Sequence, residues 1–239
     1  MAGGSLFERP HHRRIAALLG ALDADLLAAN ACWFGGGTAM ALRYGEYRES
    51  VDIDFLVAET AGYRALRERL TGPAGVQAIA RPGALLEASR EVRADQYGIR
   101  TLLRTDGIDI KLEIVSETRI ALQVPGAADL VCGVATLTPL DMAASKLLAN
   151  SDRWGDDAVM SRDLIDLAMM QPGAPLFRQA LAKAKTAYGK SVAADLDKAI
   201  EALRARPHRL DRCMEALQIT TVPKALLWKR IKALKGVAG

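Results

Sequence analysis

The sequence predicts an α+β protein, with a mixed sheet in its N-terminal part and a helical bundle in its C-terminal part. Up to about residue 137, short stretches in which apolar and polar residues alternate are interspersed with stretches of helical periodicity. From Thr138 onward, the periodicity is helical. We therefore expect an α/β domain over residues 1–137 and a helical domain over residues 138–239.

The N-terminal domain is expected to begin with an amphipathic helix over residues 10–28, because large aliphatic residues recur there at helical spacing. A short helix capped by Thr38 follows three glycines, and the alternation in VDIDFLV predicts a strand. TAGYRALRERL then returns to helical periodicity. The remaining predicted strands are VQAIA, QYGIRTLLR, IDIKLEIV and RIALQV, with the turn TDG between the second and the third.

The helical domain begins at TPLD, where Thr138 can cap a helix that starts with Pro139 and has an acid in its first turn. Apolar spacing and breaks such as QPGAP and TTVP delimit the helices that follow. The predicted helices cover residues 139–150, 161–170, 175–188, 191–206, 208–218 and 222–235.

A chain of 239 residues, half of them apolar, can bury a sizeable core. No apolar run approaches the roughly 18 residues of a membrane span, and the N-terminus lacks the apolar segment of a signal peptide. The three cysteines have neither CxxC nor Cys/His spacing. We expect a cytoplasmic protein with no membrane partner, no disulfide framework and no zinc site.

Charge is distributed unevenly along the chain. Residues 1–171 contain 18 Lys and Arg against 23 Asp and Glu, which gives −5, whereas residues 172–239 contain 14 against 5, which gives +9. A basic segment of this kind can bind a polyanion, although a solvated cationic helix face has the same composition. The helical domain is therefore expected to carry a basic surface.

The predicted strand in SVDIDFLV carries two acids. Asp52 and Asp54 point to the same face, because alternate side chains of a strand share a face. Neighbouring carboxylates repel each other, and Mg²⁺ prefers one or two carboxylates plus substrate phosphates. A metal-binding pair is therefore one reading, and a solvated acidic face on an edge strand is the other.

A third acid can come from IDIKLEIV, in which Asp109, Lys111 and Glu113 share one face. Two aspartates on one strand and an acid on another suit a two-metal site. Either Asp109 or Glu113 could be this third ligand. An ion pair with Lys111 is the alternative role for at least one of these two acids.

The three glycines before the aspartates, Gly35 to Gly37, allow the backbone to approach an anion closely. The helix that follows them offers unpaired N–H groups and the positive end of its dipole to a phosphate. A tight turn would explain the glycines equally well, so their value as a signal depends on their position just before the aspartate pair.

Two segments together resemble a known family. GGTAMAL and YRESVDIDF resemble the opening motif of the AbiEii/AbiGii toxin family within the DNA polymerase β-like nucleotidyltransferase superfamily, and DMAASKLLANSDRWGDDAVMSRDLIDL resembles its helical K…R…RD…D motif. The matching segments span about residues 30–170. The resemblance implies a polymerase β-like core with a mixed sheet and transfer of a nucleoside monophosphate from an NTP with Mg²⁺ or Mn²⁺. It also implies, for many members, a role as the toxin of a toxin–antitoxin or phage-defence system, and some members act on tRNA.

The resemblance also implies roles for individual residues. Those matching the phosphate-binding turn and its surroundings are Gly36, Gly37, Thr38 and Ser50, and those matching the metal-binding acids are Asp52 and Asp54. For the third acid of the motif, we favour Glu113 over Asp109. In the helical motif, Lys146 matches a triphosphate ligand, and Asp163 matches the acid of RD. Arg162 and Asp166, four residues apart, can share a helical face and help to bind or orient the nucleotide.

We therefore expect a nucleotidyltransferase whose catalytic residues are Asp52, Asp54, Lys146 and Asp163, with an NTP as substrate, an RNA, tRNA in particular, as acceptor and an antitoxin protein as a further partner. Two other hypotheses remain open. One is transfer to a small molecule such as an antibiotic, and the other is a catalytically idle module that binds RNA or protein. The histidines His11, His12 and His208 are not expected to be catalytic or to bind a ligand.

Overall fold

The computed structural model describes residues 7–238, and the chain divides into two compact units. The sheet unit comprises residues up to Glu46 and from Ser50 to Thr138, and the helical unit comprises Tyr47–Glu49 and Pro139 onward. The short segment Tyr47–Glu49 is therefore part of the helical unit, although the chain on both sides of it belongs to the sheet unit.

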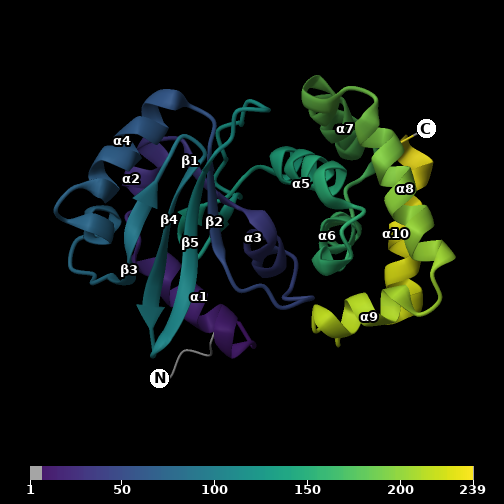
Figure 1. Cartoon of the computed structure of the whole chain (residues 1–239), viewed down its shortest axis with the longest axis horizontal. Coiled ribbons are helices and arrows are strands. Elements are labelled where there is room, and N and C mark those ends of the chain that lie inside the picture. The colour runs from purple at the N-terminus through teal and green to yellow at the C-terminus, as the bar shows by residue number, and fades with distance from the viewer. Residues whose placement is uncertain (1–6, 239) are drawn as a thin grey trace. The chain divides into compact units, whose positions relative to one another are not determined.

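The sheet unit is built on a sheet that, within the described residues, has five strands in the order β1-β2-β5-β4-β3 (Figure 1). Its elements are α1 (Pro10–Ala21), α2 (Ala24–Ala29), β1 (Cys32–Gly35), α3 (Gly36–Arg43), β2 (Ile53–Val57), α4 (Thr60–Thr71), the 3-10 helix η1 (Gly75–Ile79), β3 (Glu87–Ala94), β4 (Gly98–Thr105), β5 (Ile108–Ser116), β6 (Leu130–Val131) and β7 (Val134–Ala135). β2 and β5 are parallel, and the other neighbours in the sheet are antiparallel. The expectation of a mixed sheet is thus confirmed.

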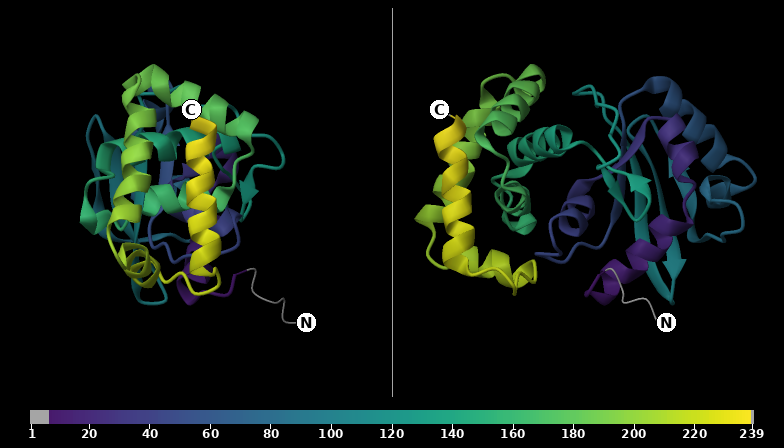
Figure 2. Two further views of the ribbon diagram at one scale, coloured as in Figure 1. Left: turned by 90° about the vertical axis from the view of Figure 1, so that its right-hand side faces the viewer. Right: turned by 180° about the vertical axis from the view of Figure 1, so that it is seen from behind.

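One face of this sheet is apolar and covered. Alternate side chains of β2, β4 and β5 are buried in it, namely Ile53, Phe55, Ile99, Leu103, Ile110, Leu112 and Ile114. Figures 1 and 2 show α1, α2 and α4 on that side of the strands. The opposite face carries the alternate, polar positions, and the candidate site residues of β2 and β5 lie there.

Several predicted elements of the sheet unit are wrong in detail. The expected helix over residues 10–28 is interrupted after Ala21, because Asp23 caps a second helix by accepting a hydrogen bond from the Leu26 N–H at 2.9 Å. VQAIA forms η1 rather than a strand, and RIALQV contains no strand. The strands β1 and β3 were not foreseen, the latter because EASREVRA has no apolar alternation.

Other expectations for this unit are confirmed. The turn TDG joins β4 to β5, with Asp106 and Gly107 both in the left-handed region at φ of 49° and 73°, as a tight hairpin requires. The expected short helix is present as α3, but the expectation that Thr38 caps it is wrong: the helix begins at Gly36, with Gly35 as its N-cap residue, and Thr38 lies inside it.

The helical unit contains α5 (Pro139–Arg153), the 3-10 helix η2 (Asp157–Val159), α6 (Arg162–Met170), α7 (Ala174–Tyr188), α8 (Ser191–Ala205), α9 (Arg209–Ala216) and α10 (Lys224–Ala238). These bounds agree closely with the helices predicted from apolar spacing. Helix α10 packs against α6, α7 and α8 through Leu227, Ile231 and Leu234, and the left view of Figure 2 shows α8 and α10. None of the described helices combines the length and the apolar composition that a membrane span requires.

Candidate active site

The glycine turn lies where β1 ends and α3 begins. Gly36 has φ +67°, a conformation that side chains rarely tolerate, and a Cβ there would come within 2.4 Å of the Asp54 Oδ2 atom. Glycine at this position is therefore required both by the backbone and by the close approach of the carboxylate. Gly37 and Thr38 belong to the first turn of α3, whose backbone N–H groups have no partner inside the helix.

Asp54 is placed by its two neighbouring strands. It pairs with Gly35 of β1 on one side and with Glu113 of β5 on the other. Asp52 directly precedes β2, and both aspartates are partly exposed. Lys111 of β5 lies close enough to interact electrostatically with both carboxylates.

The two candidates for the third acid differ in position and in partners. Glu113 is the register partner of Asp54, and it accepts hydrogen bonds from Arg100 Nε at 2.7 Å and from Lys111 Nζ. Asp109 lies beyond the part of β5 that pairs with β2, and it accepts hydrogen bonds from Arg104 Nε and Nη2 at 2.9 and 3.1 Å. Burial would raise the pKa of Glu113, but the hydrogen bonds from Lys111 and Arg100 outweigh it and lower the pKa.

A buried histidine holds the segment that leads into the aspartate pair. Thr38 Oγ1 donates to Ser50 Oγ at 2.9 Å, and the Ser50 N–H donates to His12 Nε2 at 3.1 Å. The Nε2 atom must then be unprotonated, so the proton is on Nδ1, which lies 2.7 Å from Glu46 Oε1. Sequence reasoning gave His12 no role, although it lies three residues before Ile15, on the buried face of α1.

Burial and hydrogen bonding act in opposite directions on Glu46. Burial would raise the pKa of its carboxyl group, but hydrogen bonds from the Glu8 N–H, from His12 and from the Arg9 N–H outweigh burial and lower the pKa. Glu46 is therefore a carboxylate that can accept the His12 Nδ1 proton as a hydrogen bond, which keeps the histidine in the tautomer that receives the Ser50 N–H.

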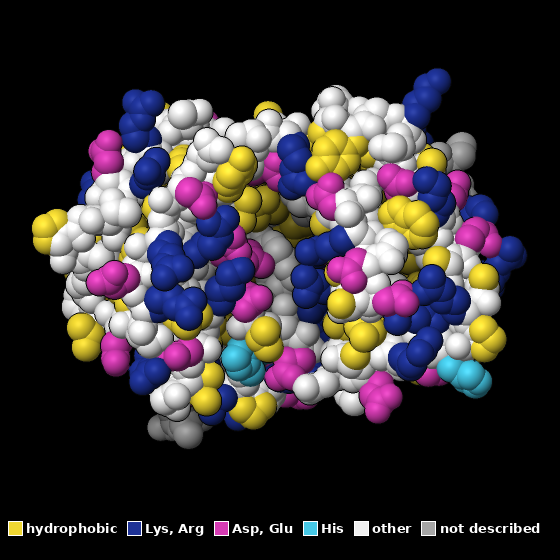
Figure 3. All heavy atoms as spheres, in the orientation of Figure 1, with side chains coloured by type: hydrophobic (Ala, Val, Ile, Leu, Met, Phe, Trp, Pro, Cys, Tyr) yellow, Lys and Arg dark blue, Asp and Glu magenta, His cyan; other side chains and the backbone are white. Residues whose placement is uncertain are grey.

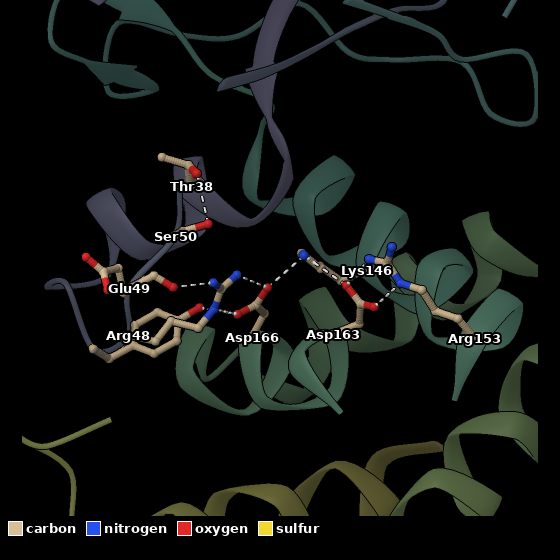
Figure 4. A network of polar contacts seen from close by, with 9 residues as sticks. Thr38, Arg48, Glu49, Ser50, Lys146, Arg153, Asp163 and Asp166 are labelled. Carbon is tan, nitrogen blue, oxygen red and sulfur yellow. Dashed lines mark hydrogen bonds and ion pairs between the residues drawn. The ribbon is translucent and has the colours of Figure 1, made fainter. Parts of the chain in front are cut away.

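The residues of the helical motif form a charged cluster inside the helical unit (Figure 4). Lys146 of α5 is 6% exposed, and its Nζ lies 3.0 Å from Asp163 Oδ1 and 2.7 Å from Asp166 Oδ2. Arg153 Nε, at the end of α5, donates to Asp163 Oδ2 at 2.7 Å. Both acids of α6 therefore contact Lys146, and each also binds an arginine.

Asp166 receives its arginine from the segment Tyr47–Glu49. Arg48 Nε and Nη2 donate to the two carboxylate oxygens of Asp166 at 2.7 and 3.0 Å, and Tyr47 Oη donates to Oδ1 at 2.6 Å. The sequence predicted that Arg162 and Asp166 share a helical face. Arg162 is instead exposed, and Asp166 is fully buried.

The cluster shifts the protonation equilibria of its members. Burial would raise the pKa of Asp163, but Lys146 and Arg153 lower it well below its usual range. The pKa of Asp166 is also lowered, because Arg48 and Lys146 outweigh its complete burial. Burial and the Asp166 charge raise the pKa of Tyr47. Both carboxylates are therefore ionised at neutral pH, and Tyr47 keeps its proton.

A glycine turn against an aspartate pair, on a mixed sheet that is followed by a helical unit, defines a nucleotidyltransferase. The chain belongs to the family described as nucleotidyl transferase AbiEii toxin of type IV toxin–antitoxin systems, because a model of that family matches residues 17–233. The expected resemblance and the expected enzyme class are thus confirmed.

Solved structures with the same fold come from Helicobacter pylori. One, described as a candidate nucleotidyltransferase from H. pylori, is 18% identical with a TM-score of 0.51, and the alignment covers 99% of this chain and 96% of that one. Another, JHP933, is 17% identical with a TM-score of 0.51, and the alignment covers 96% and 94%. No curated protein matches the sequence.

Proposed function

We propose that the protein transfers a nucleoside monophosphate from an NTP to an acceptor hydroxyl, which attacks the α-phosphate and loses its proton as pyrophosphate leaves, with Asp52 and Asp54 binding Mg²⁺ or Mn²⁺. The observation that carries this proposal is the direct contact between the glycine turn and Asp54, which leaves no room for a side chain at Gly36. A phosphate bound at the turn would therefore lie beside the carboxylate. Asp52 and Asp54 would hold a Mg²⁺ ion there, since Mg²⁺ prefers one or two carboxylates together with phosphate oxygens and water.

The residues present fit a divalent ion that binds together with its nucleotide. Within residues 7–238, no group of three or more His, Cys, Asp or Glu side chains is arranged to hold a metal. The two aspartates are a pair, and the adjacent Glu113 already binds Arg100 and Lys111. We propose Glu113, rather than Asp109, as the third acid, because only Glu113 is in register with Asp54. When bound, the metal would neutralise the triphosphate and activate the attacking oxygen.

The remaining site residues would act on the nucleotide. Gly36, Gly37 and Thr38 would present backbone N–H groups to phosphate, and Ser50 would be held in place by Thr38 and His12. Lys146 is the proposed triphosphate ligand of the helical unit. Its ammonium group has three N–H donors and contacts two carboxylates, so its third donor would contact a phosphate oxygen.

Asp163 and Asp166 would position Lys146 rather than contact the nucleotide themselves, because their negative charges would repel a triphosphate and each already binds Lys146. Arg162 is exposed at the first position of α6, where it would be able to contact the substrate.

The proposed acceptor is RNA, and tRNA in particular. The surplus of 14 Lys and Arg over 5 Asp and Glu after residue 171 suits a polyanion. Because the family is one of toxins, the protein is proposed to modify RNA in the cytoplasm and thereby disable it. Its proposed role is that of the toxin in a toxin–antitoxin or phage-defence system, controlled by a cognate antitoxin. Transfer to a small molecule such as an antibiotic is the second candidate, because the aspartate pair and the glycine turn would serve either acceptor.

The test is incubation of the protein with each α-labelled NTP and with either total RNA or aminoglycosides, in Mg²⁺ and in EDTA. We expect label to appear in RNA, in the size range of tRNA, only when Mg²⁺ is present. Label in the aminoglycosides would favour the second candidate. If neither RNA nor the aminoglycosides are labelled and the protein shows no Mg²⁺-dependent NTP binding, the protein is an idle module and the proposal is contradicted.

A further inference from the structure

The polar face of the sheet carries a group of cations that the proposed chemistry does not use. The register places them in rows that run across the sheet toward the aspartates. In one row, Arg93 of β3 pairs with Arg100 of β4, which pairs with Glu113 of β5, which pairs with Asp54 of β2. Because register partners share a face, all four side chains lie on the same side of the sheet.

Two further rows extend this pattern. Arg90 pairs with Leu102, which pairs with Lys111, and Glu87 pairs with Arg104, which pairs with Asp109. We call the five cations the basic sheet face: Arg90, Arg93, Arg100, Arg104 and Lys111. Figure 3 shows Lys and Arg side chains gathered over the strands β3, β4 and β5 of Figure 1.

These cations are accessible although some of them bind acids. The side chains of Arg100, Arg104 and Lys111 are 38%, 45% and 42% exposed while they contact Glu113, Asp109 and Asp95. Arg90 and Arg93 lie on the edge strand and are exposed. The five cations outnumber the three acids that they bind, Glu113, Asp109 and Asp95, and Glu87 and Asp54 are further acids on this face.

Protection of the sheet edge explains only part of this pattern. Charged residues on an edge strand prevent pairing with another chain, and Arg90 and Arg93 can serve that purpose. Arg100, Arg104 and Lys111, however, lie on interior strands whose edges are already paired. Four of the five cations are arginines, whose planar groups bind phosphate through two parallel hydrogen bonds.

We propose that the basic sheet face binds the phosphates of the RNA acceptor, so that the strand runs from the edge at β3 across β4 and β5 to its reactive hydroxyl near Asp54. This inference rests on the proposed function. Adjacent strands are about 4.8 Å apart, so Arg93 lies roughly 14 Å from Asp54 across three steps of the sheet. The row can therefore contact the last few nucleotides before the reacting end, without reading their bases.

The test compares two double substitutions that remove the same charge from opposite sides of the sheet unit. Arg90→Gln with Arg93→Gln changes the basic sheet face, and Arg64→Gln with Arg69→Gln changes exposed positions of α4 on the other side. The affinity of each protein for fluorescein-labelled bulk tRNA is measured by anisotropy over a range of salt concentrations. Circular dichroism confirms that both variants are folded.

The first variant should bind tRNA more weakly, and the slope of log affinity against log salt should fall by roughly 1.4 to 1.8, since each lost phosphate contact removes about 0.7 to 0.9. In the transfer assay its KM for tRNA should rise, while its affinity for a nonhydrolysable NTP stays unchanged. The α4 variant should behave as the wild type. Arg90→Lys with Arg93→Lys should restore the salt slope, because it keeps both charges.

Equal tRNA affinity and equal salt slope in the first variant and the wild type would overturn the inference, and so would a wild type that binds no tRNA. In either case the surface would fit an acidic protein partner better. If tRNA binding weakens as expected in the first variant but the wild type transfers no label, the proposed function is contradicted. The inference that the basic sheet face binds RNA is then retained.

Discussion

Asp52 and Asp54 of the sheet unit are partly exposed beside a lysine that is itself half-exposed, whereas Asp163 and Asp166 of the helical unit are buried and each binds two cations. The residue type is the same in both places. In the sheet unit the two carboxylates are partly exposed to solvent, and in the helical unit cationic side chains surround two buried carboxylates.

This difference separates residues that should matter for chemistry from residues that should matter for folding. A carboxylate in a partly solvated pair can lose its charge with little effect on the fold. A buried carboxylate with two cationic partners cannot, because its removal leaves those cations buried without compensation. The following predictions test this separation, from the largest expected effect to the smallest.

Asp54→Asn and Asp52→Asn should each reduce nucleotidyl transfer by about 10³-fold or more, which corresponds to roughly 4 kcal/mol of transition-state stabilisation. Stability in urea should change by less than about 1 kcal/mol, because the substitutions keep the shape of the side chain and relieve repulsion within the pair. Initial rates with labelled NTP and unfolding curves provide both numbers. Near-native turnover of either variant in Mg²⁺ would contradict the assignment of the metal ligands.

Asp166→Asn should lower the free energy of unfolding by about 3 to 5 kcal/mol, because Arg48 and Lys146 would lose a shared buried counter-charge. The matched control is Glu215→Gln, at an exposed position of α9 in the same unit, which should change stability by less than about 0.5 kcal/mol. Urea denaturation measures both. A loss below about 1 kcal/mol for Asp166→Asn would show that the cluster does not stabilise the helical unit.

Glu113→Gln should reduce transfer by about 10- to 100-fold, or roughly 1.4 to 2.7 kcal/mol, since Glu113 is the register partner of Asp54. Asp109→Asn removes the same charge from the same strand outside that register, and its rate should stay within about 2-fold of the wild type. The two rates are compared at saturating NTP. If Asp109→Asn is the more damaging change, the third acid has been assigned to the wrong residue.

The helical unit should lose stability as the pH falls, and Asp166→Asn should reduce that loss. A carboxyl group whose pKa is lowered on folding contributes stability that is present above its unfolded pKa of about 3.9 and is lost as the pH falls through the folded value. The pKa values of Asp163 and Asp166 are both lowered, so below roughly pH 5 the unfolded chain binds protons that the folded chain does not.

Removing Asp166 should make the free energy of unfolding fall less steeply between roughly pH 5 and pH 3, by up to about 1.4 kcal/mol per pH unit for one proton. Urea titrations at several pH values measure this slope, and Glu215→Gln again serves as the control. Parallel curves for the wild type and Asp166→Asn would show that Asp166 does not titrate differently in the two states.

The sequence by itself determined the features that depend on local periodicity. The helices after Thr138 and the strand that carries Asp54 were predicted closely, because apolar spacing reports which side of a helix or strand is buried. The motifs also led to the nucleotidyltransferase class and the family. These features involve residues that are near one another in the chain.

Only the tertiary structure decided the partners of the charged residues and the strands without an apolar pattern. Arg48 binds Asp166, which is 118 residues away, and the Ser50 N–H binds His12, which is 38 residues away. Strand β3 is a strand because its backbone hydrogen-bonds to β4, and its side chains are nearly all exposed. Neither an ion pair between distant residues nor an exposed edge strand leaves a periodic signal in the chain, because both depend on which segments the fold brings together.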